Sequence, residues 1–228
     1  MKQKDQQTDP VISEEKLYQA FRLMKKKEFD AAKELIREGL KAAAEKKDAM
    51  LEGLYHSAHG VLYKLTGDYK KAFKSYQHAE QLIPEDLSLK IISAVLLVEQ
   101  FKQYETAFRK LEKIIGLTED PAITHHALTT QAIALFHMNK KEKAKEKFEL
   151  AFKADFSLLR FVANVDFKAV DLFTRKGFEL NLCEQYLSKA LVLAQGHNDS
   201  TYVIVIEELL GRLGLYQDAE KTKSKPTP

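Results

Sequence analysis

A recurring trio of residues is the feature that most constrains how this chain can fold. In the stretch TGDYKKAFKSYQHAEQLIP at residues 66–84, Ala72 comes three positions after an aromatic residue, Tyr69, and four before another large side chain, Tyr76. These spacings place the three side chains on one face of an α-helix. Similar sets recur, one with lysine in the first place and the last incomplete: Phe29, Ala32 and Ile36; Tyr104, Ala107 and Leu111; Lys141, Ala144 and Phe148; Tyr216 and Ala219.

The spacing of these sets indicates a chain of similar units. Successive alanines are 40, 35, 37 and then 75 residues apart, so the last interval is about two units long. Residues 159–195 fall in that interval, and they hold two segments of helical periodicity separated at Gly177. We therefore predict about six units.

Each unit is predicted to contain two antiparallel helices. The segment GLYHSAHGVLYKL also has helical periodicity, and it meets the stretch quoted first at Gly67, where a tight turn favours a residue without a Cβ. Residues that commonly cap the amino end of a helix mark further helix starts. They are Ser13 before Glu14 and Glu15, Asp86, Asp120 before Pro121, and Asn198 to Ser200.

The composition is that of a soluble protein made of helix formers. The 228 residues are 45% hydrophobic and 30% charged, with 9 glycines, 5 prolines and no tryptophan. The net charge is only +3, and no segment has the basic excess of a nucleic-acid-binding surface. The longest apolar run, residues 94–98, is far shorter than the roughly 20 residues that span a bilayer. We expect neither a nucleic-acid partner nor membrane insertion.

Cysteine usage and the amino end both favour the cytoplasm. Cys183 is the only cysteine, so no intramolecular disulfide can form, which fits a reducing compartment. The first residues, MKQKDQQTDP, are polar and lack the apolar core of a secretory signal. A cytoplasmic location is therefore predicted.

Residues 53–86 resemble the tetratricopeptide repeat (TPR), a motif of about 34 residues. Nine positions at the motif's spacings carry the resemblance: Gly60, Tyr63, Gly67, Asp68, Tyr69, Ala72, Tyr76, Ala79 and Pro84. His56 and His59 depart from it, since they stand where the family often has Trp and Leu. The other units, which match less well, are residues 13–46, 88–121, 125–156, 164–197 and 200–220.

The resemblance implies a fold and its limits. The expected fold is an all-α, right-handed superhelical solenoid of about six TPR-like antiparallel helix pairs. It is predicted to cover residues 13–220, with disordered segments at 1–12 and 221–228.

The resemblance also implies a binding groove lined by the first helix of every pair. Projected onto this sequence, the lining is apolar: Leu17, Phe21, Met24, Val61, Leu65, Leu89, Ile92, Leu96, Ile133 and Phe136. The polar residues expected at the rim are Lys64, Glu99, Gln100 and His137. Some family members hold the terminal carboxylate of a chaperone tail with a Lys, Asn and Arg clamp. The matching positions here carry no such residues, which disfavours a chaperone tail as the ligand.

We therefore predict a non-enzymatic adaptor or scaffold that binds a peptide or an amphipathic helix of another protein in this groove. A groove filled by the chain itself is one alternative. A second is a structural subunit that forms a homodimer through the same apolar face or through its last hairpin. Residues 201–216 are apolar on more than one side, and Ile204 is the candidate contact. A third is an enzyme or small-ligand receptor on a helical scaffold.

Reactive residues give weaker signals than the repeat does. His56 and His59 are three positions apart and His78 could join them, but no further ligand has a recognised metal-binding spacing, so no metal is predicted. Cys183 lies on an apolar helix face and is interpreted as a buried cysteine rather than a nucleophile served by His197. No phosphate-binding loop or paired-carboxylate motif is present in the sequence, so neither catalytic residues nor a cofactor are predicted.

Two further surface predictions concern charge. His125 and His126 open a helix and are expected at the surface. The lysine-rich run at residues 140–153 is interpreted as a solvated helix face, with an acidic partner as the alternative.

Overall fold

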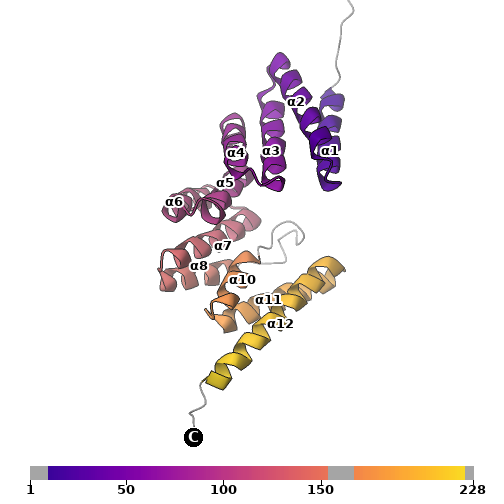
Figure 1. Ribbon diagram of the computed structural model, residues 1–228. Helices are drawn as coiled ribbons and strands as arrows, with labels where there is room; N and C mark the ends of the chain where they lie inside the picture. The colour runs from indigo at the N-terminus through magenta and orange to yellow at the C-terminus, as the bar shows by residue number, and fades with distance from the viewer. Residues whose placement is uncertain (1–9, 154–166, 224–228) are drawn as a thin grey trace, which may run out of the picture. The chain divides into compact units, whose positions relative to one another are not determined.

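The computed structural model describes residues 10–153 and 167–223, and within these ranges every regular element is an α-helix (Figure 1). The predicted all-α fold is therefore confirmed. The helices are α1 (Pro10–Lys25), α2 (Phe29–Lys46), α3 (Ala49–Leu65), α4 (Tyr69–Leu82), α5 (Leu87–Glu99), α6 (Tyr104–Ile115), α7 (Pro121–His137), α8 (Lys141–Lys153), α10 (Lys168–Arg175), α11 (Leu180–Gly196) and α12 (Ser200–Lys223).

The chain divides into two compact units, residues 1–96 and residues 97–228, with the boundary inside α5. In the first unit α1 packs on α2, α2 on α3, and α3 on α4. In the second unit α6 packs on α7, α7 on α8, and α11 on α12. Both units are thus stacks of sequence-adjacent helices, as the repeat pattern predicts.

The recurring trio marks the start of each second helix. Its first residue opens α2, α4, α6 and α8 in turn, and all eight of the other members are fully buried. The buried members are Ala32, Ile36, Ala72, Tyr76, Ala107, Leu111, Ala144 and Phe148. The alanine lets the neighbouring helix approach, and the large side chain fills the space beside it.

Each pair turns through a residue in the left-handed backbone region, two positions before the second helix of the first four pairs. Gly67 has a φ of 81° there, as its role in the turn predicts. Lys27 and Lys102 take the same conformation with φ of 63° and 54°, although it is less favourable for a residue that carries a Cβ. In the turns of the first two pairs, the residue after the left-handed one donates its backbone N–H to the carbonyl oxygen five positions before it. This bond pairs a carbonyl that the end of the first helix would otherwise leave without a partner.

Side-chain caps confirm most of the predicted helix starts. Asp86 accepts a 2.8 Å bond from the N–H of Ser88, and Asp120 a 2.7 Å bond from the N–H of Ala122. Asp199 caps α12 in the same way. The predicted helix start at Ser13 is wrong, because α1 already begins at Pro10. Proline is favoured in the first turn of a helix, since it lacks an N–H that would remain unpaired there.

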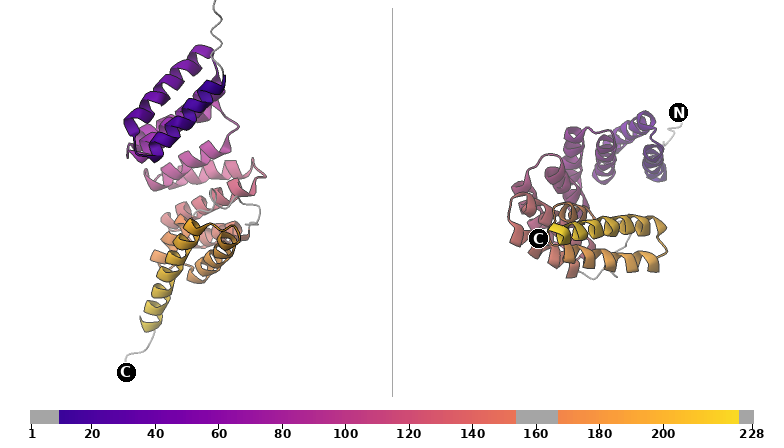
Figure 2. Two further views of the ribbon diagram at one scale, coloured as in Figure 1. Left: turned by 90° about the vertical axis from the view of Figure 1, so that its right-hand side faces the viewer. Right: turned by 60° about the horizontal axis from the view of Figure 1, so that its bottom comes forward.

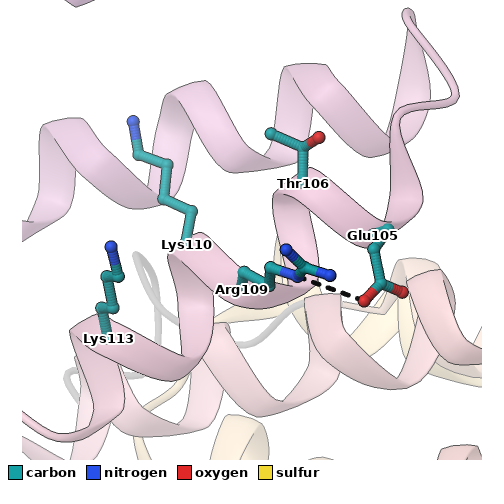
Figure 3. A pocket seen from close by; sticks show the side chains of 5 residues that line it. All are labelled: Glu105, Thr106, Arg109, Lys110 and Lys113. Carbon is teal, nitrogen blue, oxygen red and sulfur yellow. Dashed lines mark hydrogen bonds and ion pairs between the residues drawn. The ribbon is translucent and has the colours of Figure 1, made fainter.

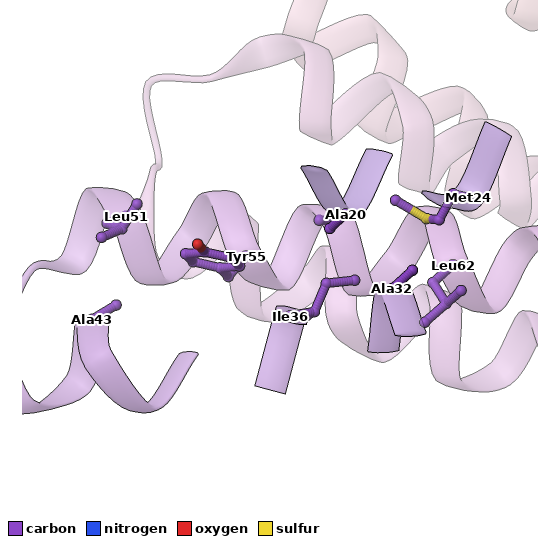
Figure 4. Close-up of a cluster of buried hydrophobic side chains, with 9 residues drawn as sticks. Ala20, Met24, Ala32, Ile36, Ala43, Leu51, Tyr55 and Leu62 are labelled. Atoms are coloured by element: carbon purple, nitrogen blue, oxygen red, sulfur yellow. The ribbon is translucent and has the colours of Figure 1, made fainter. Parts of the chain in front are cut away.

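The core of the first unit lies between α1, α2 and α3 (Figure 4). Its buried residues are Ala20, Met24, Ala32, Ile36, Ala43, Leu51, Tyr55, Ala58 and Leu62. Gly39 of α2 faces the ring of Tyr55 so closely that a Cβ there would lie 2.0 Å from a ring carbon. Gly60 of α3 faces Tyr76 in the same manner, at 2.7 Å. In both places a glycine on one helix makes room for a tyrosine on the next.

The second unit has an aromatic core around α7, α8 and α10. Phe148 stands edge to face with Phe173 at 5.2 Å and stacks on Tyr186 at 5.3 Å between ring centroids. Phe136 lies 5.4 Å from Phe173 and 5.1 Å from Phe178. These rings join α7, α8, α10 and α11 into one packed unit.

His125 is fully buried in the second turn of α7, so its predicted surface position is wrong. Its Nδ1 lies 3.0 Å from the carbonyl oxygen of Ala151, and its Nε2 lies 2.7 Å from the hydroxyl of Tyr186. A carbonyl only accepts, so Nδ1–H donates to Ala151 and the Tyr186 hydroxyl donates to Nε2. The burial is tolerated because both ring nitrogens are paired.

The fifth pair, α10 and α11, confirms two predictions. Gly177 separates the helices with a φ of 61°. Cys183 is fully buried, and burial raises the pKa of its thiol to about 12, which suits a packing residue rather than a nucleophile. Leu180, Cys183 and Leu187 occupy the positions of the trio in α11.

The predicted sixth hairpin at residues 200–220 is instead one continuous helix, α12, which packs along α11 (Figure 2). Tyr216 and Ala219 lie inside it, so they open no second helix. The predicted ends also shift outward, since α1 includes residues 10–12 and α12 continues to Lys223. Two neighbouring glycines, Gly211 and Gly214, do not break α12, because glycine weakens a helix without blocking its hydrogen bonds.

We predict that Gly39→Ala lowers the free energy of unfolding by about 1–3 kcal/mol, because its methyl group would collide with the Tyr55 ring. The higher helix propensity of alanine would instead raise the free energy of unfolding by about 1 kcal/mol, so the sign of the change distinguishes the two effects. Urea unfolding measures this change. Gly116→Ala is the control, since its Cβ would lie no closer than 3.6 Å to any atom of the described residues. An equal effect of the two substitutions would contradict the close approach.

A second pair of variants tests the buried hydroxyls. Tyr186→Phe removes the donor to His125 and should cost about 1–3 kcal/mol of stability. Tyr76 is equally buried, but its hydroxyl has no hydrogen-bond partner among the described residues, and burial raises its pKa. Tyr76→Phe should therefore leave stability unchanged or increase it by up to about 1 kcal/mol. Thermal unfolding measures both variants, and a Tyr76→Phe variant less stable than Tyr186→Phe would refute this account.

Candidate protein-binding surfaces

Four of the residues predicted to line the groove are buried in the free chain. Met24, Leu89, Leu96 and Ile133 are 3%, 4%, 2% and 7% exposed, so they offer a partner little surface. A charge at Leu96 would therefore disturb folding, and it cannot serve as a simple test of partner binding. Ile92 is half-buried, and the partner-binding role of all five residues stays a prediction.

Three other predicted residues are engaged within the second unit. Phe136 packs against Phe173 and Phe178, and His137 stacks on Tyr104 with ring centroids 4.9 Å apart. Burial, and then the charges of Lys176 and Lys102, lower the pKa of His137. Glu99 forms an ion pair with Lys168. Gln100, which is also predicted at the rim, is exposed.

The four remaining predicted lining residues lie on α1 and α3, two helices that contact each other in the first unit, and all four keep some exposed apolar area. Leu17 and Val61 are half-buried and pack against the core, while Phe21 is 39% and Leu65 51% exposed. In each helix the exposed residue follows the half-buried one by four positions, so each pair shares a face. We call Leu17, Phe21, Val61 and Leu65 the α1–α3 surface.

The α1–α3 surface has a basic margin. Arg22 and Lys25 are exposed in the last turn of α1, and Lys64 is exposed in the last turn of α3. Lys16 lies one residue before Leu17, but it forms a 2.9 Å ion pair with Glu38. The predicted rim role of Lys64 belongs to this margin. Tyr18, 68% exposed beside Leu17, is a further large side chain that the face projection alone did not select.

A second surface feature is a shallow hollow of about 420 Å³ along α6 (Figure 3). It is lined by Glu105, Thr106, Arg109, Lys110 and Lys113. The Arg109 Nε lies 3.3 Å from Glu105, and Lys140 reaches the same carboxylate at 3.7 Å. Because Glu105 offsets part of this positive charge, the hollow carries a weaker signal for an acidic ligand than its three basic residues indicate. The lysine-rich run on α8 is likewise partly paired, with Lys145 3.0 Å from Glu179.

The histidines weighed as metal ligands contact one another and their neighbours. The rings of His56 and His78 meet edge to face at 5.2 Å, as the sequence allows, whereas His59 stacks on Tyr63 at 4.4 Å. Burial is the main cause that lowers the pKa of His56 and of His59. In the described part of the chain, no group of three or more His, Cys, Asp or Glu side chains could hold a metal ion.

Comparisons with known proteins show similarity of structure. No protein-family model matches the sequence, and no curated protein matches it. PilW, a widely conserved type IV pilus biogenesis factor, aligns with a TM-score of 0.60 and 14% identity over 89% of this chain and 93% of PilW. PilF of Pseudomonas aeruginosa aligns with a TM-score of 0.58 and 20% identity, over 92% and 97% of the two chains. BtubC of P. vanneervenii gives 0.60 and 20%, over 96% and 86%.

These solved structures are helical-repeat proteins of one type. The fold is of the tetratricopeptide-repeat type. The resemblance inferred from residues 53–86 is thereby confirmed. The TPR-type fold also extends over units whose sequence matches the TPR motif only weakly. The TM-scores of 0.58 to 0.60 establish the TPR-type fold, whereas identities of 20% or less do not transfer the activity of these proteins to this chain. Over the described residues, no helix is long and apolar enough to cross a bilayer.

We predict that His56 and His59 make the first unit less stable as the pH falls. In the folded chain their pKa values lie below the ordinary 6.5, so as the pH falls the two histidines are protonated in the unfolded chain before they are protonated in the folded one. The stability that the neutral rings contribute is complete above about pH 6.5 and declines below it. The melting temperature measured between about pH 7.5 and 5.5 should fall less in His56→Gln/His59→Gln than in the wild type. An equal fall in the double variant and in the wild type would contradict this role of the two rings.

Proposed function

We propose that this protein is a non-enzymatic, cytoplasmic adaptor whose α1–α3 surface binds an amphipathic helix of another protein. One observation carries the proposal: Phe21 and Leu65 remain 39% and 51% exposed on two helices that touch. Large apolar side chains gathered on neighbouring helices commonly mark an interaction site. The TPR-type fold supports the proposal, because stacked helical repeats create extended binding faces.

Binding would be driven by removing these apolar side chains from water. Burial yields roughly 25 cal/mol per Å² of apolar area, and a few well-packed aromatic or aliphatic anchors dominate most interfaces. Phe21 and Leu65 are the anchors that can still lose exposed area. Leu17 and Val61 are already packed against the core, so they hold the floor of the surface in place.

The basic margin indicates what the partner helix carries beside its apolar stripe. Arg22, Lys25 and Lys64 would favour acidic residues flanking that stripe and would repel basic ones. Exposed ion pairs contribute little affinity individually, so the charges select the partner and its orientation while the apolar anchors supply most of the binding free energy. We therefore propose an amphipathic helix with acidic flanks.

The test uses a displayed library of amphipathic helical peptides selected against the purified full chain. We expect enrichment of peptides that combine an apolar stripe with acidic flanks. Binding of the selected peptides should weaken about tenfold or more in Phe21→Asp/Leu65→Asp, which places charge in the apolar surface. Fluorescence anisotropy measures the affinity, and circular dichroism verifies that the variant folds.

The matched control is Leu117→Asp/Leu150→Asp, which adds the same charge at two exposed apolar residues of the second unit. It should bind the selected peptides as the wild type does. Equal binding by all three proteins, or equal loss in both variants, would show that the peptides do not use the α1–α3 surface.

A further inference from the structure

Helix α12 carries large apolar side chains on its buried side and also on the opposite, exposed side. Ile206, Leu209 and Leu213 are buried, and α12 contacts α10 and α11 within the second unit. On the face turned away from them, Ile204 is 59% and Leu215 is 74% exposed. Large apolar side chains exposed together on one side of a helix commonly mark a contact with another protein.

The residues between Ile204 and Leu215 complete a stripe along the outer face. Glu208 and Gly211 fall between them at helical spacing, so the order along the face is Ile204, Glu208, Gly211, Leu215. Packing among the described residues does not require the glycine, since a Cβ at Gly211 would meet none of their atoms within 4 Å. Glycine in the middle of a helix reduces its stability, but it lets another backbone approach closely.

We infer that this outer face of α12 binds the α12 of a second copy of the chain in antiparallel orientation. A two-fold axis beside residues 209 and 210 sets Ile204 of each copy against Leu215 of the other. The same register brings Glu208 of each copy beside Arg212 of the other. One surface thus supplies both halves of a closed contact, as a two-fold dimer requires.

Charge complementarity selects this occupant and this orientation. Within one chain Arg212 lies 3.8 Å from Glu208 and 3.4 Å from Asp171, and both Arg212 and Glu208 are largely exposed. Antiparallel pairing would add a third acidic neighbour, the Glu208 of the other copy, to each Arg212 and would alternate the charges across the contact. A parallel pair would place Glu208 against Glu208 and Arg212 against Arg212, which is repulsive.

The inference does not depend on the proposed function. The α1–α3 surface lies in the first unit and α12 in the second. Loss of dimerisation and loss of peptide binding are separate measurements on separate variants, so either idea can fail alone.

Sedimentation velocity of the full chain over a range of concentrations gives the first test. We expect a reversible monomer–dimer equilibrium, and Ile204→Glu/Leu215→Glu should raise its dissociation constant about tenfold or more. The control Leu117→Glu/Val192→Glu adds the same charge at residues that are 69% and 68% exposed outside the stripe. A monomeric wild type at every concentration, or a control as defective as the test variant, would overturn the inference.

A charge-reversal experiment tests the register. Arg212→Glu alone and Glu208→Arg alone should each weaken the homodimer, because both create clusters of like charge. An equimolar mixture of the two variants should form a mixed dimer, since each copy then supplies the charge that the other lacks. Failure of the mixture to associate would overturn the antiparallel register.

Cysteine cross-linking tests the orientation directly, because the native Cys183 is buried. Ile204→Cys mixed with Leu215→Cys should form a disulfide between copies. Ile204→Cys alone should not, since the two cysteines would lie about 16 Å apart along the pair. The opposite outcome, in which Ile204→Cys links to itself and the mixture does not, would refute the antiparallel pair.

Discussion

The structure depends on the close approach of neighbouring helices at residues with little or no side chain. Gly39 faces Tyr55 and Gly60 faces Tyr76, and the alanines of the recurring trio are fully buried beside their large partners. Each small residue leaves space that the large side chain of the neighbouring helix fills, so the small and the large residue are needed together for close packing. Since neither helix of a pair buries its apolar face alone, stacking propagates from one pair to the next.

The same constraint explains which parts of the fold could be predicted from the sequence. Alanine three positions after a helix start leaves a clear mark, so the starts of α2, α4, α6 and α8 follow from it. In α11 the same positions hold Leu180, Cys183 and Leu187, which pack equally well but do not show the pattern. Packing depends on shape, and several residue types offer a similar shape.

The candidate site was harder to predict for two physical reasons. A face projection gives the direction in which a side chain points, not the depth to which it is covered, so Leu96 and Phe21 looked alike although one is 2% and the other 39% exposed. Burial of His125 depends on Tyr186, which lies 61 positions further along the chain. A histidine pair at a helix start cannot reveal that partner, because only the folded chain brings the two together.

Glycine shows how the same residue can serve different ends in one repeat protein. At Gly39 the neighbouring ring occupies the space that a Cβ would need, so the fold itself accounts for the glycine. At Gly211 and Gly214 no atom of the described residues occupies that space, and α12 continues through both glycines although each weakens the helix. Among the described residues, then, no contact offsets the helix stability that these two glycines forfeit. A second helix lying against the exposed stripe from Ile204 to Leu215 would supply such a contact at Gly211, by the same close approach that joins the pairs inside each unit.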